Sequence, residues 1–215
     1  MSTTGHSVTW LNDDMADAAT AANAGVEQDP RVERSRRVIL EAVLAELGDV
    51  GYGSMTIEGV ASRAGVGKST IYRHWPGKLE LVEDAFRTVK AQVDVPEHGT
   101  IRDRVISILE QVADLVAEST YSACMPALIE AAERDPLVHD FHCRFSAERR
   151  AVLVSVLRNA VADGELAAGT NSEILADALV GPILMRRLML GLPITRDIAT
   201  ALVDQLLPVT VEPAR

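Results

Sequence analysis

The sequence predicts an all-α protein of about nine helices, and three observations lead to that prediction. In one segment after another of the 215-residue chain, apolar residues recur at intervals of three and four, the spacing that gathers them on one helix face. Hydrophobic residues make up 47% of the chain, enough for a sizeable core. Signals that begin or end helices separate the segments: Asp29-Pro30, Gly65, Pro76-Gly77, Asp135-Pro136 and Asp163-Gly164.

Composition divides the chain into an acidic extension and two helical domains. Residues 1–30 carry five acids and no Lys or Arg, and we expect them to form a disordered N-terminal extension. Residues 31–90 are expected to form the first domain, and residues 100–210 the second. The formal net charge is −10, yet residues 31–90 carry ten Lys and Arg against eight acids. The first domain is therefore the only section with a net positive charge.

The first domain opens with a helix that begins at Asp29-Pro30. Four arginines crowd its first turns, where positive charge opposes the helix dipole: Arg31, Arg34, Arg36 and Arg37. Contact with nucleic-acid phosphates and an ordinary solvated face are both open interpretations of these arginines. The glycine-rich segment 48–53 is predicted to be a turn that leads into the second helix.

A short second helix is predicted to begin after Thr56 and to end at Gly65. Thr56 is a favourable N-cap, and Gly65 takes the positive φ that ends a helix without steric cost. Apolar residues between them share one face: Ile57, Val60, Ala61 and Ala64. A third helix begins near Lys68 after a tight turn, so the stretch has the spacing of a helix-turn-helix.

The third helix is predicted to have a buried and an exposed side. Ile71 and Trp75 lie four residues apart and should face the core. The exposed side carries cations, hydroxyl groups, a tyrosine and an imidazole, which can contact phosphates and base edges in a major groove. Its residues are Lys68, Ser69, Thr70, Tyr72, Arg73 and His74. After Pro76-Gly77, Lys78 opens the next helix, where its ammonium group and the backbone amides together suit a phosphate.

A nucleotide-binding interpretation of the same stretch fails on its context. Gly67-Lys68-Ser69 copies the end of a phosphate-binding loop, but the glycine that such a loop requires five positions earlier is Ser62. The preceding segment also has a helical pattern, whereas that loop follows a buried strand. We therefore expect no nucleotide site here.

Residues 33–88 resemble the DNA-binding domain of the tetracycline-repressor (TetR) family of bacterial transcription regulators. The resemblance is carried by RRVILEAVLAELGDVGY and by MTIEGVASRAGVGKSTIYRHWPGKLELV. It covers the whole three-helix unit and the linking helix. It implies that DNA is contacted by Thr56, Lys68, Ser69, Thr70, Tyr72, His74 and Lys78.

Five further helical segments are predicted after residue 99. Thr100 and Asp103 form a capping pair for the first, and Tyr121 to Arg134 is the second, with Pro126 tolerated only in a first turn. The third runs from Asp135-Pro136 to Ala162. The last two, Ser172 to Leu190 and Thr195 to Leu207, are the most apolar, and the first of these should be buried on two sides. Such a pair forms either the centre of a core or a subunit interface.

The family resemblance implies specific roles for this second domain. It implies a homodimer formed through Ser172–Leu190 and Thr195–Leu207, and a cavity for a small-molecule effector. Candidate cavity residues are Cys124, Met125, Leu128, Phe141, Phe145 and Met185, with ordinary core packing as the alternative for each. Because aromatic residues make up only 4% of the chain, we expect a modest apolar or weakly polar effector.

Other classes of protein and site are weakly supported. There is no apolar run of membrane-spanning length and no secretory leader, so a cytoplasmic protein is expected. Cys124 and Cys143 suit free thiols, and His139, His142 and Cys143 on one helix lack a convincing fourth metal ligand. No set of catalytic residues is recognisable, and we expect neither an enzyme nor a cofactor.

The prediction from sequence is a homodimeric repressor of the TetR type. It would bind a palindromic DNA operator and be released by a small molecule. The competing hypothesis is a helical ligand-binding or scaffold protein whose helix-turn-helix does not bind DNA, and the acidic overall charge is the feature that favours it.

Overall fold

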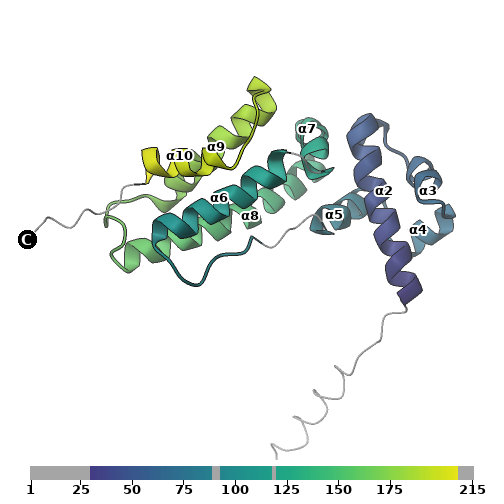
Figure 1. The fold of residues 1–215 in the computed structure, drawn as a ribbon. Helices are drawn as coiled ribbons and strands as arrows, with labels where there is room; N and C mark the ends of the chain where they lie inside the picture. Colours follow the sequence, from purple (N-terminus) through teal and green to yellow (C-terminus); the bar gives the residue numbers. More distant parts are fainter. Residues whose placement is uncertain (1–29, 89–92, 118–119, 208–215) are drawn as a thin grey trace, which may run out of the picture. The chain divides into compact units, whose positions relative to one another are not determined.

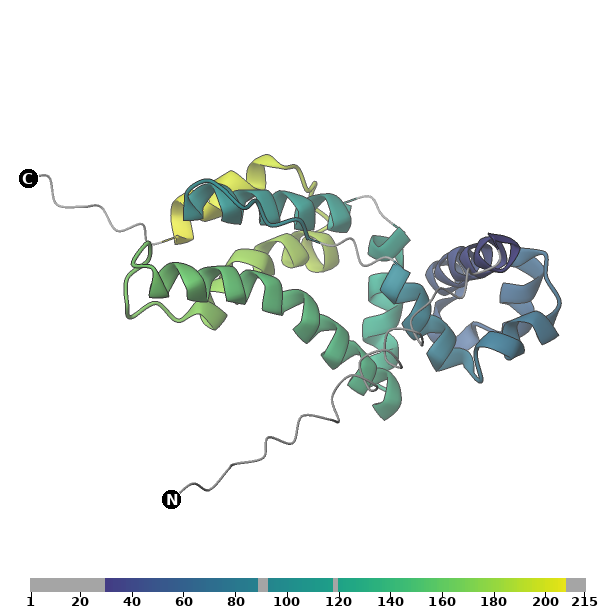
Figure 2. The ribbon, with the colours of Figure 1, turned by 90° about the horizontal axis from the view of Figure 1, so that it is seen from below.

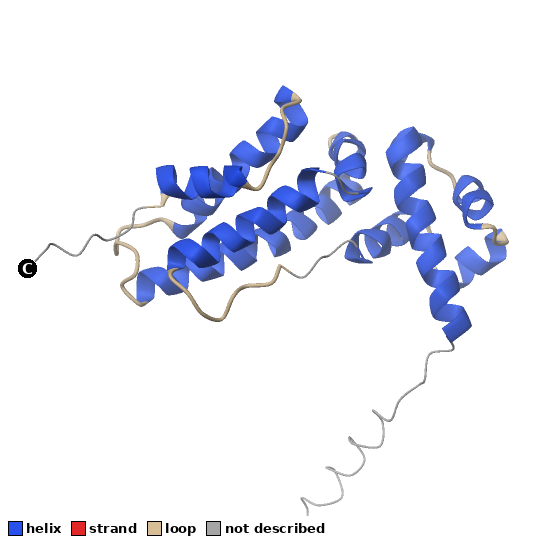
Figure 3. Cartoon of the chain, in the orientation of Figure 1, coloured by secondary structure: helices blue, strands red, loops and turns tan. Residues whose placement is uncertain are grey.

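A computed structural model describes residues 30–88, 93–117 and 120–207, and these residues form helices without any strand (Figures 1 and 3). The helices are α2 (Pro30–Ser54), α3 (Ile57–Ala64), α4 (Lys68–His74), α5 (Lys78–Thr88), α6 (Ile101–Ala117), α7 (Thr120–Ala132), α8 (Pro136–Ala162), α9 (Ser172–Met185), the π-helical segment η1 (Arg186–Leu190) and α10 (Asp197–Leu206). The predicted all-α fold class is confirmed. The predicted extension, apart from Pro30, lies outside the described residues.

One compact unit begins at Arg37, and the packing described below lies within it. The first residues of α2 belong to the preceding unit. Two apolar cores fill the compact unit. The first joins α2, α3, α4 and α5 with residues of α7 and the start of α8, and the second joins α6, α8, α9 and α10.

The turn predicted over residues 48–53 is found at Gly51, where the two helical stretches that make up α2 meet at a kink. Only Gly51 leaves helical geometry, with φ of +76°, which produces a kink. Before the kink, α2 includes Gly48, since a glycine costs a helix only about 1 kcal/mol relative to alanine. Gly48 also lies close to α7, where an added Cβ would meet the Ala123 side chain at 3.5 Å.

The requirement that Pro126 lie in a first turn is wrong, because this proline lies well inside α7. A proline has no N–H to donate, so the carbonyl of Ser122 loses its helical partner. The guanidinium of Arg187, in η1, donates to that carbonyl at 3.3 Å and to the Ser122 hydroxyl at 2.7 Å. A side chain from a distant helix therefore replaces the missing hydrogen bond.

The helix starts predicted at Thr100 and at Asp135-Pro136 are confirmed by their caps. Thr100 and Asp103 bond each other reciprocally, with the Thr100 hydroxyl 2.7 Å from the Asp103 carboxylate. Asp135 caps α8 through the amide of Leu137 at 2.9 Å. From these starts, α6, α8, α9 and α10 pack against one another (Figures 1 and 2).

Within a single chain α9 is buried on one side, not on two as predicted. Its buried residues are Ala176, Leu179 and Ile183. Other large apolar side chains of α9, η1 and the segment that follows are exposed. They are Ile174, Met185, Met189, Leu190, Leu192 and Leu206. Among the described residues, no helix is long and apolar enough to cross a membrane.

Candidate nucleic-acid interface and ligand cavity

The turn between α3 and α4 is fixed by the two caps that the sequence predicts. The hydroxyl oxygen of Thr56 accepts a hydrogen bond from the amide of Gly59 at 3.0 Å, which satisfies one free donor at the start of α3. Gly65 ends α3 with φ of +66°, a conformation that side-chain-bearing residues rarely adopt. The chain then re-enters a helix at Lys68. These caps set the angle at which α4 leaves α3.

The buried side of α4 anchors it to the core. Ile71 is fully buried, as predicted, and Trp75, just after the last residue of α4, is 5% exposed. The indole N–H of Trp75 donates to a carboxylate oxygen of Asp84 at 2.9 Å, inside the core. Asp84 was not predicted from the sequence, since a carboxylate within the apolar pattern of α5 gives no signal of its partner. The bond fixes the end of α4 against α5.

The opposite side of α4 presents the predicted polar residues to solvent. Lys68, Ser69, Arg73 and His74 are exposed, and Thr70 is partly buried. Tyr72 is 55% exposed, a large fraction for an aromatic residue. A short helix whose outer side carries only hydrogen-bonding groups can enter a DNA major groove and contact base edges and phosphates there.

Lys68 is held by an acidic neighbour on α3. Its ammonium group donates a hydrogen bond to the carboxylate of Glu58, and both side chains are exposed. The hydrogen bond raises the pKa of Lys68 above its ordinary value and lowers the pKa of Glu58. A phosphate approaching Lys68 therefore competes with an internal carboxylate.

We expect Glu58→Gln to strengthen DNA binding. The change removes a negative charge beside the candidate interface and releases Lys68 for a phosphate. The plot of log affinity against log salt should steepen by about 0.9 for one additional neutralised phosphate, as measured by fluorescence anisotropy. Glu130→Gln is the matched control, because Glu130 of α7 is the ion-pair partner of Arg134. This change should leave the slope unchanged. An unchanged slope for Glu58→Gln would place Lys68 outside the interface.

Lys78 has a structural environment that the sequence did not reveal. Its ammonium group donates to the carbonyls of Tyr52 at 2.7 Å and Met55 at 3.3 Å, and lies 4.3 Å from the centre of the Tyr52 ring. Partial burial lowers the pKa of Lys78. Lys78 thus ties the start of α5 to the end of α2, and its contact with DNA stays a prediction.

Arg63 connects α3 to α2 in a similar way, and the sequence did not predict this contact. Its guanidinium donates to Glu46 at 3.0 Å and to Asp49 at 2.7 Å. Both carboxylates come from α2, so α3 is held to α2 by charge as well as by the core. Spacing along one helix carries no information about such a contact between two helices.

A cavity of about 380 Å³ lies between α6, α8 and α9 in the second core. Its walls are mostly apolar, with Arg149, Arg150 and Asp177 among its polar residues. The remaining residues are Val93, Ile108, Val112, Leu115, Val116, Tyr121, Ser146, Val152, Leu153, Ala176, Val180, Gly181 and Leu184.

None of the six residues named from the sequence as candidate cavity residues lines this cavity. Cys124, Leu128, Phe141 and Phe145 pack in the first core, Met125 packs in the second, and Met185 is exposed. The Cys124 thiol donates to the carbonyl of Leu44, and burial raises its pKa to about 11. Five of the six side chains therefore fill the packed cores beside the cavity and do not form its walls.

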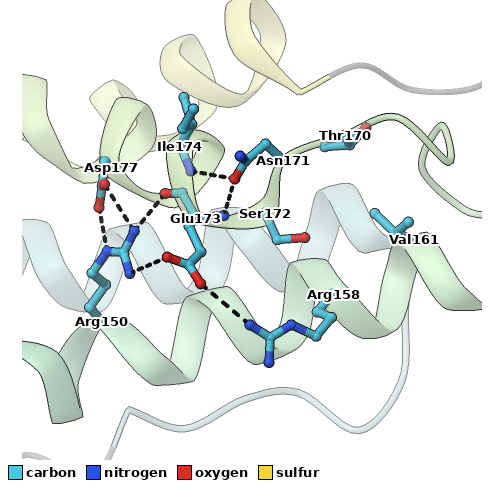
Figure 4. Close-up of a pocket in the computed structure, with 9 residues that line it drawn as sticks. All are labelled: Arg150, Arg158, Val161, Thr170, Asn171, Ser172, Glu173, Ile174 and Asp177. Carbon is cyan, nitrogen blue, oxygen red and sulfur yellow. Dashed lines mark hydrogen bonds and ion pairs between the residues drawn. The ribbon is translucent and has the colours of Figure 1, made fainter.

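A second, open depression of about 530 Å³ lies over the start of α9 (Figure 4). Its charged side chains are already paired. Arg150 bonds Asp177 at 2.9 Å and approaches Glu173 at 3.4 Å, and Arg158 approaches Glu173 at 3.7 Å. Asn171 caps α9 through the amides of Glu173 and Ile174. This network holds α9 against α8.

The described residues contain no group of three or more His, Cys, Asp or Glu placed to hold a metal ion. Cys143 and His139 do approach each other, with 3.4 Å between Sγ and Nε2. Partial burial lowers the pKa of His142, and the positive charge of His139 lowers it further.

Comparison with known protein sequences agrees with the geometry. Residues 39–85 match the model of bacterial regulatory proteins of the tetR family, and residues 95–206 match the tetracyclin repressor-like C-terminal domain. A helix-turn-helix transcriptional regulator of Mycobacterium tuberculosis is 32% identical over 171 residues, which cover 79% of this chain and 84% of that protein. The DNA-binding transcriptional repressor TetR of Mycobacteroides abscessus is 29% identical over 189 residues, which cover 85% and 97%.

Solved structures show the same fold. The crystal structure of a TetR-family transcription regulator with 30% identity has a TM-score of 0.62 and covers 80% of this chain and 96% of that one. FadR from Bacillus subtilis, crystallised with stearoyl-CoA, has a TM-score of 0.69 at 14% identity and covers 80% and 97%. The chain belongs to the TetR family of bacterial transcriptional regulators, which are DNA-binding proteins and not enzymes.

Proposed function

We propose that this protein is a homodimeric repressor that binds a palindromic operator through α4 and is released by a small molecule. The observation that carries the proposal is the outer side of α4, where Lys68, Tyr72 and Arg73 are exposed while Ile71 and Trp75 hold the helix in the core. Most of the protein's excess negative charge lies outside residues 31–90, so the net charge of the whole chain does not oppose DNA binding by α4. The relative from Mycobacteroides abscessus, named as a repressor, supports the direction of regulation.

Selection of bound duplexes from a randomised pool tests this proposal. Two copies of α4 related by a two-fold axis should enrich an inverted repeat whose half-sites are centred about one helical turn, roughly 10 base pairs, apart. Enrichment of a single half-site would contradict the dimeric interpretation. No enrichment at all would favour the competing hypothesis of a scaffold that does not bind DNA.

The exposed apolar side chains of the last helices support the dimer. Ile174 and Met185 lie eleven residues apart in α9, and Met189 follows four residues later, so all three point in similar directions around the helix. All three side chains are exposed. A group of large, exposed apolar side chains on one surface normally marks an interface between proteins. We therefore assign the dimer interface to the segments Ser172–Leu190 and Thr195–Leu207.

We expect Met189→Glu to convert the dimer into monomers. Met189 is 73% exposed in the single chain, and a carboxylate there would be buried against its symmetry mate without a partner. Sedimentation velocity should show half the wild-type mass. Leu137→Glu is the matched control, because Leu137 is 65% exposed but lies on α8, and it should stay dimeric. A dimeric Met189→Glu variant would place the interface elsewhere.

The cavity between α6, α8 and α9 is the place we propose for the effector. It is closed by the same helix, α9, that carries the proposed dimer surface. The first core also joins α7 and α8 to α5, the helix that follows α4. A molecule in the cavity can therefore bear on the separation of the two copies of α4, and a small change in that separation misplaces one of them on the operator.

A further inference from the structure

Three of the four arginines of α8 have carboxylate partners. The pairs are Arg144 with Glu83 at 3.1 Å, Arg150 with Asp177 at 2.9 Å, and Arg158 with Glu173 at 3.7 Å. Figure 4 shows how the last two arginines turn toward the carboxylates of α9. Arg144 and Arg150 have hydrogen-bond acceptors, and Arg158 has an ion pair and a largely exposed side chain, so none of the three needs a ligand.

Arg149 is the exception. Its Nη1 atom is shielded from solvent and has no hydrogen-bond partner among the described residues. The guanidinium lies over two rings instead, 5.0 Å from the centre of Tyr121 and 5.4 Å from that of Phe145. Ring faces attract a cation but do not satisfy its N–H donors, and a buried charged donor without an acceptor is unfavourable.

Arg149 is also part of the cavity wall between α6, α8 and α9. Around it the wall is formed by aliphatic side chains, among them Val112, Val116, Leu153 and Leu184. The other arginine of the wall, Arg150, is neutralised by Asp177. The cavity thus combines an apolar body with one unsatisfied cation.

We propose that this cavity binds an apolar monocarboxylate, whose carboxylate accepts hydrogen bonds from Arg149 and whose hydrocarbon or aryl body contacts the aliphatic wall. The proposal rests on the effector role proposed above and names its chemistry. A carboxylate matches the planar fork of one guanidinium. A phosphate carries up to two charges and would need a second free cation, which Arg150 does not supply.

The cavity volume limits the size of the ligand. A volume of about 380 Å³ equals roughly a dozen waters at ~30 Å³ each. It therefore holds a carboxylate of roughly ten to fifteen non-hydrogen atoms, such as decanoate or 4-phenylbutyrate.

The rings under Arg149 connect such a ligand to the DNA-binding helices. Tyr121 and Phe145 both touch Phe86 of α5 edge to face, with ring centres 5.9 Å and 5.5 Å apart. A carboxylate that accepts hydrogen bonds from the Arg149 guanidinium would draw this group away from the two rings. Ligand binding is thereby linked to the packing of α5.

Calorimetric titration of the full-length protein tests the proposal with three ligands of equal chain length. Decanoate should bind at least roughly tenfold more tightly than 1-decanol, because only the carboxylate offers charged acceptors to Arg149. Decylamine should bind most weakly, since it places a second cation beside the first. Equal affinity for decanoate and 1-decanol, or binding of neither decanoate nor 4-phenylbutyrate at millimolar concentration, would overturn the proposal.

Arg149→Met tests the residue itself. The variant should lose the preference for decanoate over 1-decanol while still binding 1-decanol, because the cavity stays open and only its unpaired cation is removed. Arg158→Met is the control on the same helix, since Arg158 does not line this cavity, and it should keep the preference. A preference that survives in a folded Arg149→Met variant would overturn the assignment. If that variant fails to fold, the comparison of ligands on the wild-type protein still decides.

A DNA release assay separates this proposal from the function on which it rests. Decanoate that binds through Arg149 without releasing operator DNA would support the cavity assignment and contradict the effector role. Operator binding by a protein that takes up no carboxylate would support DNA binding and overturn the ligand assignment.

Discussion

Phe86→Ala is expected to lower the free energy of unfolding by about 3–5 kcal/mol, the range for removing a fully buried aromatic side chain. Phe86 is 0% exposed and makes edge contacts with three rings, those of Tyr121, Phe141 and Phe145. The resulting cavity would lie in the first core, which joins the helices around α4 to α7 and α8. Denaturant titration followed by circular dichroism measures the loss.

The position of Phe86 gives the same variant a functional consequence. Because this ring connects α5 to the aromatic cluster beneath Arg149, Phe86→Ala should also weaken the response of DNA binding to the ligand. Phe86→Leu keeps most of the buried volume and should lose less stability. A Phe86→Ala variant as stable as the wild type would show that the first core does not depend on this ring.

The double variant Lys68→Ala, Tyr72→Ala should bind the operator roughly 100-fold more weakly, because each specific contact removed costs about 1–3 kcal/mol of binding free energy. Both side chains are exposed, so stability should change by no more than about 0.5 kcal/mol for each change. Fluorescence anisotropy with the selected operator measures the affinity, and denaturant titration confirms that the fold is retained.

Lys78→Ala provides the contrast to that double variant. Its ammonium group bonds two backbone carbonyls at the end of α2, so the loss should appear in the free energy of unfolding as well as in DNA binding. If the double variant kept wild-type operator affinity, α4 would not be the helix that reads DNA.

The order of helices could be predicted from sequence because local signals determine their ends. Thr56, Gly65 and Asp135 act as predicted, since a cap needs only one side chain and the backbone beside it. The error at Pro126 has the opposite cause. Pro126 lies where a tertiary contact overrides local preference, through the hydrogen bond from Arg187 to the Ser122 carbonyl.

The candidate sites were predictable to different degrees for the same reason. The outer side of α4 follows from its helical period, so its exposed residues could be named in advance. The environment of Lys78 and the cavity around Arg149 arise where helices distant in sequence meet. The signal for Arg149 was missed because α8 carries four arginines, and only the structure shows which of them lacks a partner.

Recognition of DNA by α4 is tested by a binding titration of the selected operator and of a scrambled duplex at two salt concentrations. We predict tighter binding to the operator by at least roughly 1,000-fold, and an affinity for both duplexes that falls as salt rises. Equal affinity for the two duplexes, or an affinity that does not depend on salt, would contradict the assignment of α4 as the helix by which this TetR-family protein recognises DNA.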